Sequence, residues 1–142
     1  MKILIVLIAV LSHCNSNQGL QENEPQMFRY EAVTRGSLYE VTITEDSLKV
    51  RSGLKGMDRA GRKITSEEWE QLLDVSGSFS LSEMDKFKSS GEKRFTDAAP
   101  AAMVEIKSPG GTYKSAEFDH GGAPKPLESL VKAILSLAET VE

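Results

Sequence analysis

Hydrophobic and polar residues alternate along the chain from residue 28 onwards. Phe28, Tyr30 and Ala32 share one phase, and the same alternation returns in residues 39–44 and 48–50. A period of two places successive side chains on opposite faces of a strand. We therefore expect three antiparallel strands, separated by residues 35–37 and 45–46, each burying one face.

Helix signals follow a Gly-containing stretch, residues 52–63, which we expect to be irregular. Residues 65–68 (TSEE) match a capping box, in which the Thr65 hydroxyl and the Glu68 carboxylate bind each other's backbone amides. Trp69, Leu72 and Leu73 then lie on one helical stripe, which favours core packing over a binding platform. A similar start at residues 80–83 (SLSE) predicts a shorter second helix.

Two more strands and the strongest helix complete the pattern. Residues 102–106 and 113–118 are expected strands around a turn at 109–111. The apolar residues of the closing helix recur at helical spacing: Leu127, Leu130, Val131, Ile134, Leu135 and Ala138. The order βββ-αα-ββ-α predicts one α+β domain over residues 27–142, with an antiparallel sheet of about five strands and helices packed on one face.

The first fourteen residues resemble an export signal. Lys2 precedes an apolar run from residue 3 to 11, which is too short to span a bilayer but suits a signal peptide. Residues 11–14 (LSHC) resemble a bacterial lipobox, which makes residues 1–13 the signal peptide and Cys14 the lipid-attachment site. His13 departs from the small residue usual before the cysteine. Cleavage by the ordinary secretory peptidase and an uncleaved anchor are the alternatives to the favoured lipoprotein.

Composition supports this interpretation. Cys14 is the only cysteine, so its lipidation would leave no unpaired thiol in an exported protein. Residues 14–26 are then the lipidated N-terminus and a flexible, polar tether. Asn15 is not the aspartate that retains lipoproteins at the inner membrane, which favours the outer membrane. The formal net charge of −4 argues against a nucleic-acid partner.

Several segments together resemble a group of small, uncharacterised lipoproteins of Gram-negative bacteria. They are residues 39–44 (YEVTIT), 65–73 (TSEEWEQLL), 97–106 (DAAPAAMVEI) and 113–121 (YKSAEFDHG), followed by the amphipathic helix. The resemblance covers about residues 27–140 and implies the α+β fold and a place in the cell envelope. It implies no activity. Relatives often carry a cysteine pair near the first strand, which this chain lacks.

Asp119 and His120 are the best candidates for a ligand-binding site. A histidine titrates near neutral pH and follows a carboxylate here, and Gly121 and Gly122 would let a ligand approach the backbone. A hydrolase using His120 with Asp119 or Asp97 is one hypothesis. A strand-to-helix connection, in which Asp119 binds loop amides and His120 packs or is solvated, is the other.

A cluster of cations forms the second candidate surface. It could bind anionic headgroups, lipopolysaccharide or peptidoglycan, or it could be a solvated loop balanced by the glutamates at 67, 68 and 70. Its members are Lys49, Arg51, Lys55, Arg59, Arg62 and Lys63. Asp58 is the only acidic residue in the same segment, residues 49–63.

Motifs of other function classes are missing. We find no zinc-ligand spacing, calcium loop, phosphate-binding glycine loop or nucleophile elbow. The sequence therefore predicts no catalytic residues, no metal and no cofactor. It favours a membrane-anchored, non-enzymatic module that binds an envelope protein or polymer.

Overall fold

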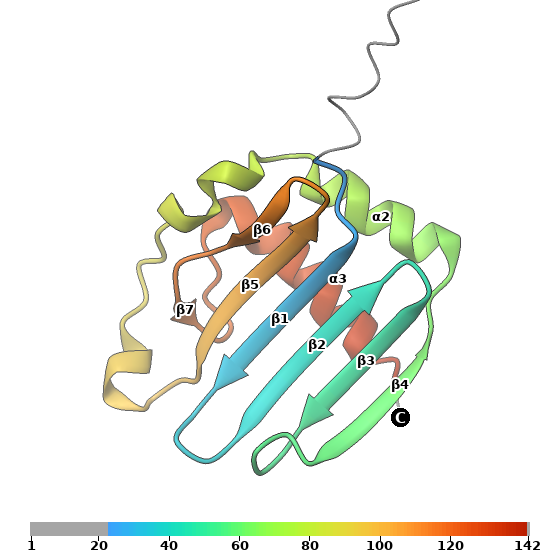
Figure 1. Ribbon diagram of the computed structural model, residues 1–142. Helices are drawn as coiled ribbons and strands as arrows, with labels where there is room; N and C mark the ends of the chain where they lie inside the picture. The colour runs from blue at the N-terminus through green and yellow to red at the C-terminus, as the bar shows by residue number, and fades with distance from the viewer. Residues whose placement is uncertain (1–22, 142) are drawn as a thin grey trace, which may run out of the picture.

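The computed structural model describes residues 23–141. The predicted signal peptide and the lipid-attachment site Cys14 lie outside these residues. The strands are β1 (Met27–Val33), β2 (Leu38–Thr44), β3 (Ser47–Ser52), β4 (Asp58–Lys63), β5 (Ala101–Ser108), β6 (Gly111–Lys114) and β7 (Phe118–Asp119). They form one antiparallel sheet in the order β4-β3-β2-β1-β5-β6, with β7 also pairing with β5 (Figure 1).

Two α-helices, α2 (Ser66–Ser76) and α3 (Glu128–Ala138), cover one face of this sheet. Three short 3₁₀ helices lie in the connections: η1 (Leu81–Lys86), η2 (Lys93–Thr96) and η3 (Lys125–Leu127). The core fills the space between the sheet and the two α-helices. Its members with no solvent exposure include Phe28, Tyr30, Ile43, Leu72, Phe118, Leu130 and Ile134.

The α+β class, the antiparallel sheet and the helices on one face are confirmed. The expected strand count of about five is wrong for two reasons. Residues 58–63, expected to be irregular, form β4, because their backbone pairs with β3 even though their side chains are mostly polar. The single strand expected over 113–118 is divided into β6 and β7, which pair with opposite ends of β5.

The expected second helix is also different from the prediction. It is the 3₁₀ helix η1, and the Ser80 side chain makes no capping hydrogen bond to it. Ser80 Oγ instead lies 3.0 Å from Ser82 Oγ. Serine side chains often form such local hydrogen bonds in place of a helix cap.

The capping box at the start of α2 is confirmed. The Glu68 amide donates to Thr65 Oγ1 at 3.2 Å, and the Thr65 amide donates to Glu68 Oε2 at 2.9 Å. Arg62 adds two hydrogen bonds to the same carboxylate, at 2.9 and 2.7 Å. The bonds from Arg62 and from the Thr65 amide lower the pKa of Glu68 from 4.5 to about 2.

We expect Glu68→Gln to remove a pH-dependent part of the stability. A depressed carboxyl pKa stabilises the fold fully above the ordinary value of 4.5, and this contribution is lost as the pH falls toward about 2. The variant should lose about 1–2 kcal/mol of unfolding free energy at pH 7, since solvent screens this half-buried pair. Urea unfolding from pH 7 to pH 2 measures the difference, which should shrink toward zero at the acidic end. A difference that stays constant with pH would contradict the assignment.

Candidate functional site

Asp119 ends the short strand β7, and its carboxylate organises the loop before β5. Its side chain is nearly buried and accepts hydrogen bonds from the backbone amides of Lys93 at 2.9 Å and Arg94 at 3.0 Å. The Arg94 guanidinium donates a third, at 3.1 Å. Burial raises the pKa of Asp119, but the two amides and the guanidinium outweigh it, so the pKa lies below its ordinary value. Asp119 is therefore a charged, fully engaged acceptor.

Residues 88–94 lie directly against the segment that follows Asp119. Ser89 Oγ donates to the Gly122 carbonyl at 2.8 Å and accepts from the Gly91 amide at 3.1 Å. A Cβ at Gly91 would lie only 2.3 Å from the Asp119 carboxylate, so only glycine allows this approach. The two segments therefore form one connected wall.

His120 points away from Asp119. Its Nδ1 lies 2.7 Å from the hydroxyl of Tyr30, a residue with no solvent exposure on β1. Burial and the neighbouring Tyr39 raise the pKa of Tyr30 above its ordinary value, so the hydroxyl remains protonated. We assign the hydroxyl as the donor, because the buried proton would otherwise lack a partner. Nδ1 then accepts, and Nε2 of this exposed residue carries a proton that it can donate.

A recess on the surface lies between the two connected segments. Its lining includes the backbone of the glycines at 91, 121 and 122. Gly121 has a positive φ of 84°, which suits glycine in this turn. The exposed polar side chains of the lining are Lys88, Ser90, Lys93, His120, Lys125 and Glu128. Five of these six can donate hydrogen bonds, and three are lysines, so the recess suits an anionic group.

The other candidate residues lie elsewhere. Asp97 is exposed, has a positive φ of 55°, and pairs with Arg35 at 3.0 Å. Among residues 23–141, His120 makes no side-chain hydrogen bond to a carboxylate, since its one side-chain partner there is Tyr30. The structure thus brings His120 together with neither Asp119 nor Asp97 as an acid–base pair.

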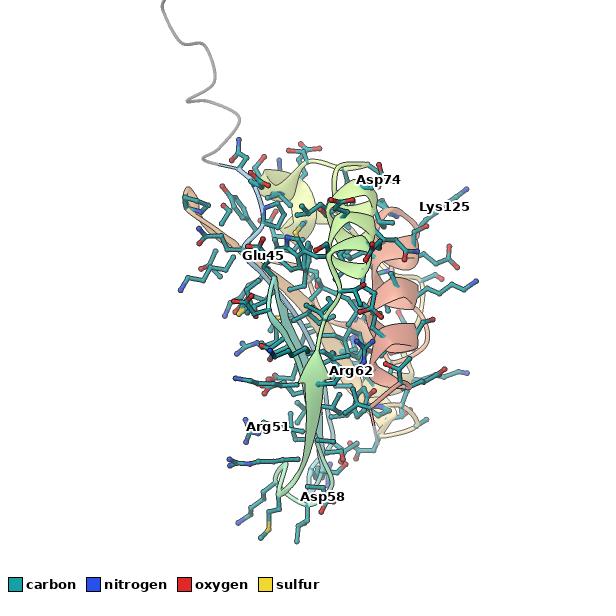
Figure 2. The ribbon with its side chains drawn as sticks, turned by 90° about the vertical axis from the view of Figure 1, so that its right-hand side faces the viewer. Glu45, Arg51, Asp58, Arg62, Asp74 and Lys125 are labelled. Carbon is teal, nitrogen blue, oxygen red and sulfur yellow. The ribbon has the colours of Figure 1, made fainter. Side chains whose placement is uncertain are left out.

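The basic cluster lies on the hairpin formed by β3 and β4. Arg51 pairs with Glu40 at 3.2 Å on the sheet face that the helices leave open. Arg62 lies on the opposite face, where it contacts Glu68 and Thr140 (Figure 2). The cluster is therefore divided between the two faces, and the expected balance by glutamates applies to Arg62.

Sequence reasoning missed Tyr30, Ser89 and Gly91 as parts of the site. Tyr30 is 90 residues from His120 along the chain and has the spacing of an ordinary core residue. The Ser-Ser-Gly run at residues 89–91 matches a plain loop. No local signal distinguishes these residues, because their partners are brought to them by the pairing of β5 with β1 and β7.

We expect Tyr30→Phe and His120→Ala to be coupled in stability. Each removes one side of the same hydrogen bond and should cost about 1–2 kcal/mol, because a buried hydroxyl or its acceptor loses its partner. The double variant should cost clearly less than the sum of the two single changes. Urea unfolding of the four proteins measures this coupling. Strict additivity would show that the bond contributes nothing to the folded state.

Residues 23–141 contain no group of three His, Cys, Asp or Glu side chains placed to hold a metal ion. None of the helices described in that range is long and apolar enough to cross a membrane. Comparisons with known protein families and with curated proteins find no match to this chain.

Proposed function

We propose that the chain is a lipid-anchored cell-envelope protein, held at the outer membrane through Cys14, that binds an anionic ligand without chemical turnover. The sequence supports the anchor by its short apolar run and by the cysteine that follows it. The resemblance to small Gram-negative lipoproteins agrees with this location. The ligand is an acidic group of an envelope polymer or of another envelope protein.

The composition of the recess around His120 carries the binding part of the proposal. Three lysines, a serine and His120 line it with exposed side chains, and Glu128 is its one exposed carboxylate. Asp119 also borders the recess, but its carboxylate is engaged by two amides and Arg94. Carboxylate and phosphate groups bind to such sets of donors through charge-assisted hydrogen bonds.

The same geometry gives less support to the hydrolase hypothesis. A general base needs its proton acceptor free and a partner that orients it. Here Nδ1 of His120 is occupied by Tyr30, and the carboxylates of Asp119 and Asp97 are bound elsewhere. The arrangement therefore favours binding over catalysis.

Anchoring is tested by Cys14→Ser. The change removes the only thiol, so labelled palmitate should no longer enter the protein and the signal should remain uncleaved or be miscleaved. Membrane association through the lipid should be lost, since several acyl chains anchor far more strongly than one. Cell fractionation and palmitate labelling measure the result. Palmitate incorporation into the variant would exclude Cys14 as the acceptor.

Binding is tested with isolated peptidoglycan sacculi, which carry many carboxylates. We expect the detergent-solubilised full chain to sediment with sacculi, and the variant Lys88→Gln/Lys125→Gln to lose about tenfold in affinity. Lys107→Gln/Lys132→Gln is the control, because these exposed lysines lie outside the recess. Soluble peptidoglycan fragments released from the sacculi are assayed in the same samples. Equal binding by both variants would contradict the recess as the site, and released fragments that disappear in His120→Ala would favour the hydrolase.

A further inference from the structure

The large hydrophobic side chains that are exposed in residues 23–141 gather at one end of the sheet. Leu54 is 64 % exposed, Met57 73 % and Phe95 72 %, and Val33 is 38 % exposed. They lie in the β3–β4 turn, in η2 and at the end of β1, which we call together the distal end. Residue 23, where the described chain begins, lies at the opposite end, beside the start of β1 (Figures 1 and 2).

The turn that carries Leu54 and Met57 is held in place by backbone hydrogen bonds. The Leu38 amide donates to the Gly53 carbonyl at 3.1 Å, and the Met57 amide donates to the Leu54 carbonyl at 3.2 Å. Gly56 has a positive φ of 65°, and a Cβ there would lie 2.8 Å from the Leu38 side chain. The turn therefore packs its backbone on β2 and leaves its two large apolar side chains in solvent.

Cations predominate on the hairpin that carries this apolar turn, and Asp58 is the one carboxylate in residues 49–63. Four of the cations share the open face of the sheet: Lys49, Arg51, Arg59 and Lys63. Arg51 lies opposite Arg59 in the β3–β4 register, and Lys49 and Lys63 lie an even number of residues from them, which places all four on the same face. Lys55 lies in the turn itself. Within the described residues, no ion pair is formed by Lys49, Lys55, Arg59 or Lys63. This positive hairpin belongs to a chain whose net charge is −4.

A fixed apolar turn beside unpaired cations has the chemistry of a surface that binds anionic bilayers. Apolar side chains enter the interface, and nearby lysines and arginines bind the negative headgroups. Neither element suffices alone when only two or three side chains take part, so both should be required. Solubility alone would explain the charges of the edge strand β4, but it would not explain the exposed Leu54 and Met57.

We propose that the distal end docks on an anionic lipid bilayer, with Leu54 and Met57 entering the headgroup region while Lys55 and Arg59 bind lipid phosphates. This proposal rests on the proposed lipid anchor in one respect: because residue 23 lies at the opposite end of the domain, the bilayer is a second one, separate from the membrane that the anchor would enter. The four side chains assigned to the bilayer, Leu54, Met57, Lys55 and Arg59, do not line the recess around His120.

The test joins two populations of vesicles. Full-length protein is reconstituted in neutral phosphatidylcholine vesicles, and flotation first shows whether it is anchored there. Fluorescent acceptor vesicles containing phosphatidylglycerol are then added, and their recovery with the protein-bearing vesicles is measured. We expect strong recovery that falls about tenfold with pure phosphatidylcholine acceptors or in high salt, because headgroup attraction is screened.

Two variants separate the apolar contribution from the ionic one. Leu54→Ser/Met57→Ser and Lys55→Gln/Arg59→Gln should each reduce acceptor recovery about tenfold, with unchanged thermal unfolding because all four side chains are exposed. Lys107→Gln/Lys132→Gln removes equal charge outside the hairpin and should leave recovery intact.

Recovery that is absent in the wild type, or unaffected by the hairpin variants, would overturn the proposal and leave the surface to a protein or polymer partner. Failure of the protein to float with neutral vesicles would contradict the lipid anchor instead, and binding of the free protein to the acceptors would then be read directly by sedimentation.

Discussion

Phe118→Ala is expected to destabilise the domain by about 3–4 kcal/mol, one of the largest effects of any single substitution here. Phe118 has no solvent exposure, and its ring centroid lies 6.3 Å from that of Tyr30. Strand β7 has only two residues, so backbone pairing alone holds it weakly to β5. The buried ring is therefore the main anchor of the segment that continues into Asp119 and His120.

The control for this prediction is Phe95→Ala, the same substitution at an exposed site. Phe95 is 72 % exposed, and Cζ of the Arg94 guanidinium lies 4.2 Å from the centroid of its ring. Its loss should cost less than about 1 kcal/mol. Urea unfolding monitored by Trp69 fluorescence measures both variants. Similar costs for the two would show that Phe118 is not packed as described.

Asp119→Asn is expected to release the loop over residues 88–96. The carboxylate holds two backbone amides and Arg94, and an amide side chain cannot replace all three contacts. The melting temperature should fall by about 5 °C or more. Trypsin cleavage after Lys93 or Arg94 should accelerate about tenfold, because local opening exposes the backbone to proteolysis.

The unfolding free energy of the wild type should fall at acidic pH, where Asp119 loses the charge that holds the loop. Since the pKa of Asp119 is depressed below its ordinary value of 3.8, its stabilisation is fully present above that value and is lost as the pH falls further. Asp97→Asn is the control, because that carboxylate makes one exposed ion pair with Arg35. It should change the unfolding free energy by less than about 1 kcal/mol. Equal proteolysis of both variants would contradict the anchoring role of Asp119.

The sequence by itself determined the layered architecture. Period-two alternation in residues 28–33 and 39–44 placed Phe28, Tyr30, Val41 and Ile43 on one face, and all four are buried. The capping box at Thr65 and Glu68 determined where α2 begins. These features depend on contacts within a few residues, so local patterns are enough to predict them.

The edge strand β4 could not be predicted from the hydrophobic pattern. Strand β4 has the sequence DRAGRK, with no apolar alternation, and its strand conformation depends on hydrogen bonds to β3. An edge strand in contact with solvent needs little hydrophobic surface. A method that relies on hydrophobic pattern therefore does not find it.

Only the tertiary structure decided the partners of the candidate site. The sequence singled out Asp119 and His120, but their roles depend on Arg94 and on Tyr30, which are 25 and 90 residues away. Adjacent residues at the end of a strand point in different directions, so Asp119 reaches the loop while His120 reaches the hydroxyl of Tyr30. The same holds for Leu54 and Met57, whose exposure depends on the packing of their turn against β2. Patterns along the chain record which side chains are apolar or charged, whereas contacts between distant strands determine which of them remain free to bind.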